Sequence, residues 1–63
     1  MMKYRIWSNE HNMWWKPYFF GYTHNIDEAG IFTLDEIRAK NYNYLITATP
    51  EDDDFLVGVI ENE

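Results

Sequence analysis

The amino-acid sequence predicts a small α+β domain, in which a small antiparallel sheet of about three to five short strands carries one short helix packed on one face and ends in a β-hairpin. Three observations predict this fold. Aromatic residues are concentrated in the first third of the chain, one helix-capping sequence follows them, and the remaining apolar segments are short and bounded by turn residues. Because the chain has 63 residues, positions 1–63 are expected to form a single domain.

The aromatic residues are expected to form the core. Eight of the twelve Phe, Trp and Tyr residues fall between Tyr4 and Tyr22, and they are densest in residues 11–22. Each large ring can bury about 150–250 Å². A chain of this size buries only about 60% of its unfolded surface, and without cysteine it forms no disulfide. A few rings must therefore supply most of the stability, and a homodimer would be one way to bury more surface.

Turn residues and β-forming residues predict three strands in the first part of the chain, at residues 4–8, 13–16 and 18–23. Pro17 ends the second strand, since proline cannot donate to a strand ladder. Gly21 is expected to form a bulge or a close approach within the third strand.

Trp14 and Trp15 are adjacent in the second of these strands. Neighbouring residues on a strand point to opposite faces of the sheet. Only one of the two indoles can therefore enter a single core, and the other should be partly exposed or should cover a second face.

A short helical segment is expected next. Residues 26–30 read as one helical turn closed by Gly30 at the position after the C-cap, and Ile31 and Phe32 are expected to return to the core.

The sequence from Thr33 to Glu36 has the form of a capping box, in which the threonine hydroxyl and the glutamate carboxylate each accept from the other residue's backbone N–H. The helix is expected to span residues 34–41. A helix this short is unstable alone, so Leu34 and Ile37 should pack onto the sheet.

The end of the chain is expected to form the hairpin. Residues 44–49 and 55–60 read as strands, and residues 50–54 read as a solvated acidic turn between them.

The charge is unevenly distributed along the sequence. The five basic residues all lie within the first forty positions, where five acidic residues balance them. The net charge of −6 therefore arises from the acidic residues at the C-terminal end, which are Glu51, Asp52, Asp53, Asp54, Glu61 and Glu63.

Catalysis and metal binding find little support in the sequence. His11 and His24 lie near carboxylates (Glu10, Asp27 and Glu28), but their spacing matches no metal motif. Ser8 is the only serine, and no set of nucleophile, base and orienting residue can be proposed. We therefore predict a non-enzymatic protein with no metal site and no cofactor.

A nucleotide or single-stranded nucleic acid is one alternative ligand, because basic and aromatic residues alternate near the N-terminus. These residues are Lys3, Tyr4, Arg5, Trp7, Trp14, Trp15, Lys16 and Tyr18. The negative net charge argues against direct binding of nucleic acid, since such binding favours a basic face.

A partner protein is the ligand that the sequence favours. Exposed indoles are common interface anchors, which makes Trp7, Trp14 and Trp15 candidates for partner contacts. The carboxylates of Glu51, Asp52, Asp53 and Asp54 could also imitate a row of phosphates and fit a basic groove. The structural alternative for the acidic residues is an ordinary solvated loop.

The order of several residues resembles a pattern in small, mostly uncharacterised phage and prophage proteins. The shared elements are Ile6-Trp7-Ser8, His11, Trp14-Trp15, Pro17, Gly21-Tyr22-Thr23, Glu28-Ala29-Gly30 and Phe32-Thr33. The resemblance covers residues 4–36, and this chain departs from it at Phe19 and Phe20. It implies no catalytic residues.

The resemblance implies a cytoplasmic protein of an infected host cell that blocks a host enzyme or defence system by stoichiometric binding. The leading hypothesis is therefore a phage-type inhibitor of a host factor, such as a defence nuclease or another nucleic-acid-binding protein. It would act through an acidic or an aromatic surface.

No apolar run long enough to span a membrane occurs in the sequence. An accessory structural protein that acts as a homo-oligomer is the third alternative.

Overall fold

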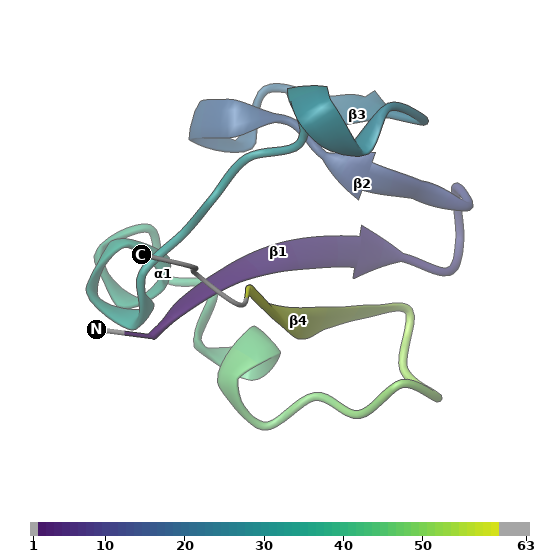
Figure 1. Ribbon diagram of the computed structural model, residues 1–63. Helices are drawn as coiled ribbons and strands as arrows, with labels where there is room; N and C mark the ends of the chain where they lie inside the picture. The colour runs from purple at the N-terminus through teal and green to yellow at the C-terminus, as the bar shows by residue number, and fades with distance from the viewer. Residues whose placement is uncertain (1, 60–63) are drawn as a thin grey trace.

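The computed structural model describes residues 2–59, and within them one four-stranded antiparallel sheet combines with one α-helix and three short 3-10 helices (Figure 1). The strands are β1 (Lys3–Ser8), β2 (Met13–Trp15), β3 (Tyr22–Thr23) and β4 (Asp54–Val59). The helices are η1 (Pro17–Phe19), η2 (Ile26–Glu28), α1 (Leu34–Ala39) and η3 (Asn43–Ile46). The predicted α+β class is confirmed.

Strand β1 lies at the centre of the fold. The sheet order is β3-β2-β1-β4, so β1 pairs with β2 on one side and with β4 on the other. The N-terminal half of β1 extends beyond β2, and there Tyr4 and Phe32 exchange two backbone hydrogen bonds of 2.8 and 2.7 Å. The chain before α1 is thereby attached to the central strand.

The two faces of the sheet differ in what covers them. Ile6 and Trp15 lie on the inner face, where Ile37 of α1 and Leu45 of η3 complete a buried cluster with Phe32. Trp7 and Trp14 lie on the other face, which we call the outer sheet face. The prediction that only one of the adjacent indoles enters the core is confirmed, and Trp15 is the buried one.

The predicted capping box starts α1. Thr33 Oγ1 accepts from the backbone N–H of Glu36 at 3.2 Å, and Glu36 Oε1 accepts from the backbone N–H of Thr33 at 2.8 Å. Ile37 is fully buried and Leu34 packs against the core, as expected.

Helix α1 ends at Ala39, two residues before the predicted end. Asn41 adopts a left-handed conformation (φ 63°), its N–H donates to the Arg38 carbonyl, and the Tyr42 N–H donates to the Ile37 carbonyl. This pair of bonds is a Schellman motif, which closes the helix and turns the chain back.

Replacing Thr33 by alanine is expected to cost about 1 kcal/mol, because it removes the oxygen that accepts from the Glu36 N–H. For a domain of this size the midpoint of thermal unfolding should fall by about 4–8 °C. The measurement is thermal unfolding followed by circular dichroism. Thr47→Ala is the matched control, because Thr47 is exposed, and equal losses in both variants would contradict a capping role.

The predicted third strand, residues 18–23, is wrong over most of its length. Only Tyr22 and Thr23 pair with β2, and residues 17–19 form a tight turn. Pro17 fixes the start of that turn, and Gly21 (φ 98°) reverses the chain so that the Lys16 N–H reaches the Gly21 carbonyl at 2.8 Å. Backbone hydrogen bonds thus close a loop where the sequence predicts a strand.

The predicted C-terminal hairpin is also wrong. The last strand exists, with Ile60 outside the described residues, but it pairs with β1. Residues 43–46 form η3 instead of a strand, because a single helical turn already buries Leu45 in the core cluster. Ile31 was expected in the core, but its side chain is 41% exposed, whereas Phe32 is buried as expected.

No helix within residues 2–59 has the length and apolar character that crossing a bilayer requires.

Candidate functional site

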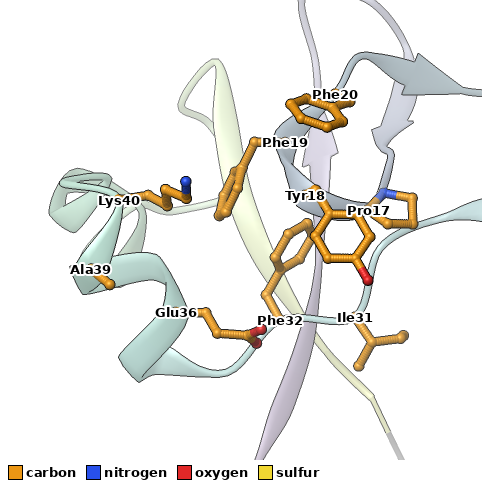
Figure 2. A pocket seen from close by; sticks show the side chains of 9 residues that line it. All are labelled: Pro17, Tyr18, Phe19, Phe20, Ile31, Phe32, Glu36, Ala39 and Lys40. Carbon is orange, nitrogen blue, oxygen red and sulfur yellow. The ribbon is translucent and has the colours of Figure 1, made fainter.

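An apolar groove of about 460 Å³ lies between the loop of residues 17–20 and helix α1 (Figure 2). Its walls come from three parts of the chain that the fold brings together, namely the loop, the segment before α1 and the outer side of α1. The lining residues are Pro17, Tyr18, Phe19, Phe20, Ile31, Phe32, Glu36, Ala39 and Lys40. We call this feature the aromatic groove.

The loop holds its side chains in an uncommon backbone conformation. Tyr18 and Phe19 have φ angles of 61° and 62°, in the left-handed region. For residues other than glycine this conformation costs about 1–2 kcal/mol each. Packing of Phe19 offsets this cost. The Phe19 ring stacks on Tyr42 with 4.9 Å between centroids, and its centroid lies 4.7 Å from that of Phe32.

The anchored loop leaves two aromatic side chains in solvent. Tyr18 is 77% exposed and Phe20 is 78% exposed, on either side of the inserted Phe19. Figure 2 shows Tyr18, Phe20 and Ile31 around the groove, with Phe32 between the loop and α1. Strained backbone that presents large apolar groups to water is more typical of recognition sites than of framework.

Two charged side chains, Glu36 and Lys40, lie beside the groove. The Glu36 carboxylate is engaged by Thr33 in the capping box. Lys40, at the end of α1, makes no ion pair with a described residue. The groove therefore offers a large apolar surface with one cation at its edge.

Tyr18→Asn is expected to stabilise the protein by up to about 1 kcal/mol, because asparagine tolerates the left-handed conformation better than tyrosine and the exposed ring contributes little packing. Phe20→Asn is the matched control, since Phe20 is equally exposed but has a φ of −104°. Urea unfolding measures both. A gain of the same size in the control would show that removing exposed apolar surface, rather than backbone strain, is responsible.

The three indoles predicted as partner contacts occupy two different environments. Trp7 and Trp14 are half-buried on the outer sheet face, with ring centroids 4.9 Å apart in an edge-to-face arrangement. Trp15 is only 8% exposed, and its Nε1 donates to Asp54 Oδ1 at 3.2 Å. Trp15 is therefore a core residue, and a partner could reach only the other two.

The acidic residues lie in a loop that internal hydrogen bonds hold in place, so they do not form an open row of carboxylates. Asp52 Oδ2 accepts from the Thr49 N–H at 2.7 Å, and Asp54 accepts from Trp15. The amide of Asn9 donates to the main-chain carbonyl of Asp52. Among the four predicted positions, Glu51 and Asp53 remain as exposed carboxylates whose side chains serve no hydrogen bond within the described chain.

Tyr44 lies beside this acidic loop. Partial burial, and then the negative charge of Asp54, raise the pKa of the Tyr44 phenol above its usual value. The same two causes, with Glu10 added, raise the pKa of Tyr22. Both phenols therefore stay protonated at physiological pH and can donate a hydrogen bond.

The two histidines do not assemble a metal site with the carboxylates near them in sequence. The His11 ring lies against Tyr22 with 4.0 Å between centroids, and its Nε2 is 3.9 Å from Glu10. Within residues 2–59, no three histidine or acidic side chains are placed to hold a metal ion.

Sequence reasoning did not identify the aromatic groove. Phe20, Ile31 and Lys40 were not predicted as site residues, and Tyr18 was predicted only in the nucleic-acid alternative. The available signal was the pair of large apolar residues at positions 19 and 20 directly before Gly21. One ring turns inward and the next outward, which is the arrangement of an anchored recognition loop.

Comparison with known proteins finds no relative of the chain. No protein-family model, no curated protein and no solved structure matches the chain. The resemblance to phage proteins stays a prediction.

Proposed function

We propose that the chain is a non-enzymatic binding protein that occupies a partner protein, in the manner of a small phage-encoded inhibitor of a host factor. The aromatic groove is its binding surface. The observation that carries the proposal is the exposure of Tyr18 and Phe20 on a loop whose backbone is held in a costly conformation. Aromatic side chains of this kind are the residues that most often dominate binding energy.

The groove determines what the partner presents. A large apolar side chain of the partner fits between Tyr18, Phe20 and Phe32, where it would be desolvated on several sides. A carboxylate next to that side chain would meet Lys40. The resemblance implies a host enzyme or defence system as the partner, and the acidic loop favours one that handles nucleic acid, such as a defence nuclease.

The acidic loop has a secondary role in this proposal. Glu51 and Asp53 can steer a basic partner toward the protein, an effect on the association rate that weakens with salt. Asp52 and Asp54 are committed to the internal hydrogen bonds described above, so changing them would test stability as well as binding.

The test begins with capture of a host protein from bacterial lysate by the tagged chain, followed by titration of the purified pair. The double variant Tyr18→Ser, Phe20→Ser should raise the dissociation constant by about a hundredfold, because each substitution removes an exposed ring. Equimolar protein should abolish the activity of the captured factor.

The control variant is Glu51→Gln with Asp53→Asn, which should mainly slow association at low salt. Wild-type affinity in the double serine variant, together with a large loss in this control, would assign the function to the acidic loop and contradict the proposal. A midpoint of thermal unfolding that rises with protein concentration without any partner would instead indicate the homo-oligomer.

A further inference from the structure

The outer sheet face carries side chains that the groove does not use. Its strand positions are Lys3, Arg5 and Trp7 from β1, Trp14 from β2, Thr23 from β3, and Phe55, Val57 and Val59 from β4. Thr23 is buried, and the other seven are half-buried. The helical segments pack their buried residues on the inner face, so this second face presents an aromatic and aliphatic surface of its own.

The described strand positions of the outer sheet face include basic but no acidic residues, although the sequence has eleven acidic residues. One carboxylate borders the face, because Glu28 Oε1 accepts from Thr23 Oγ1 at 3.1 Å beside Trp14. Lys3 and Arg5 lie on the face itself. Lys16 continues β2 in an extended conformation (φ −81°, ψ 165°), and alternation places it on the same side. Three of the five basic residues thus share one face.

Arg5 is the central cation of this face. It pairs with Val57 across the sheet, and its Nε is buried without a hydrogen-bond partner. No described carboxylate lies within ion-pair distance of its guanidinium. An anion on this face would meet the terminal N–H groups of the guanidinium, because Nε is out of its reach, and the planar arginine fork matches phosphate geometry.

The two indoles on the face are held in place. Trp7 and Trp14 are directly cross-strand neighbours, and Trp7 Nε1 donates to Asn9 Oδ1 at 3.1 Å. Their rings meet edge to face, with 75° between the ring planes. A planar ligand that stacks on the exposed part of either indole would lose little ordering entropy, because the rings are already held.

We infer that the outer sheet face binds a nucleobase together with its phosphate, as a nucleotide or as single-stranded nucleic acid. The base stacks on Trp14 or Trp7, and the phosphate accepts from the Arg5 guanidinium. This function is independent of the aromatic groove, which opens on the helical side of the sheet. The acidic loop lies at the Trp7 end of the face, where Asn9 bonds to both Trp7 and Asp52. Arg5 lies two residues farther along β1, and ionic screening over about 8 Å at physiological salt weakens the repulsion of a phosphate there.

Quenching of tryptophan fluorescence by an oligothymidylate of about eight nucleotides, and by ATP, measures this binding at low and at physiological salt. Trp14→Leu should weaken binding about tenfold and remove most of the quenching. Arg5→Gln should weaken it about tenfold and lower the slope of log K against log salt by about 0.7 for the oligonucleotide.

Arg38→Gln is the matched control, because it makes the same change of charge on α1, where Arg38 pairs with Asp35. It should leave affinity within about twofold of wild type. Tighter binding of the oligonucleotide than of ATP identifies single-stranded nucleic acid, and equal affinities identify a nucleotide site.

Three results would overturn the inference. One is equal weakening by Arg5→Gln and Arg38→Gln, which would reduce the effect to long-range charge. Another is no quenching by either ligand at low salt. The third is loss of a captured protein partner in Trp14→Leu without nucleotide binding by wild type, which would make the face a protein interface. None of these results is measured on the Tyr18→Ser, Phe20→Ser variant, so failure of this inference can be distinguished from failure of the proposed function.

Discussion

Replacing Trp15 by alanine is expected to remove about a third or more of the free energy of unfolding. The indole is buried and meets the rings of Phe19, Tyr22 and Tyr42 with centroid distances of 5.8, 6.1 and 5.4 Å. Removing a buried ring of this size costs about 3–5 kcal/mol. A domain of 63 residues has a total stability of about 3–9 kcal/mol, so the loss is about a third of the stability or more. Circular dichroism with urea titration measures the loss.

Trp14→Ala is the matched control for this prediction. Trp14 is the same residue type on the same strand, but it lies half-buried on the outer sheet face and meets only Trp7 among the rings. It should cost about 1–2 kcal/mol, the value of one aromatic pair and part of its buried area. Equal losses in the two variants would mean that the inner and outer faces contribute alike, contrary to the single core described here.

Features governed by local rules could be predicted from the sequence. The capping box depends on residues three positions apart, so Thr33 and Glu36 were enough to place the start of α1. The opposite fates of Trp14 and Trp15 follow from strand alternation alone. The strands β1 and β2 were likewise placed by short patterns and a turn between them.

Features that depend on distant contacts could not be predicted. Residues 44–49 have β-forming character, but β4 pairs with β1 and forms the edge of the described sheet, while residues 43–46 fold as η3 and bury Leu45 in the core. The aromatic groove is missed for the same reason. It requires Phe19 to stack on Tyr42, a contact between residues that are far apart in the sequence.

The residues that carry the phage resemblance are largely framework in this structure. Ser8 accepts from the His11 N–H at 3.1 Å, and Thr23 donates to Glu28 at 3.1 Å, both from buried positions. The Gly30 N–H donates to the Trp15 carbonyl at 2.9 Å. Phe20, by contrast, is a point of departure from the pattern and lies on the groove.

Gly30→Ala is expected to destabilise the protein by about 1–3 kcal/mol through overpacking. A methyl group at this position would lie 2.5 Å from Phe32 Cζ and 3.0 Å from Pro17 Cα. The Phe32 ring cannot retreat freely, because it is buried and contacts Phe19. Either the ring or the start of the loop must move, so the aromatic groove should be disturbed together with stability. Urea unfolding measures the loss.

The other two glycines separate the possible causes of that loss. Gly58→Ala meets no atom within 4 Å and should be neutral or stabilising, because alanine restricts the unfolded chain. Gly21→Ala also meets open space, but its φ of 98° should cost about 1–2 kcal/mol through backbone conformation alone. Phe32→Leu added to Gly30→Ala should recover part of the stability, since a smaller side chain relieves the contact. Additive losses in that double variant would show that the ring is not what the methyl group displaces, and that the loop at Pro17 yields instead.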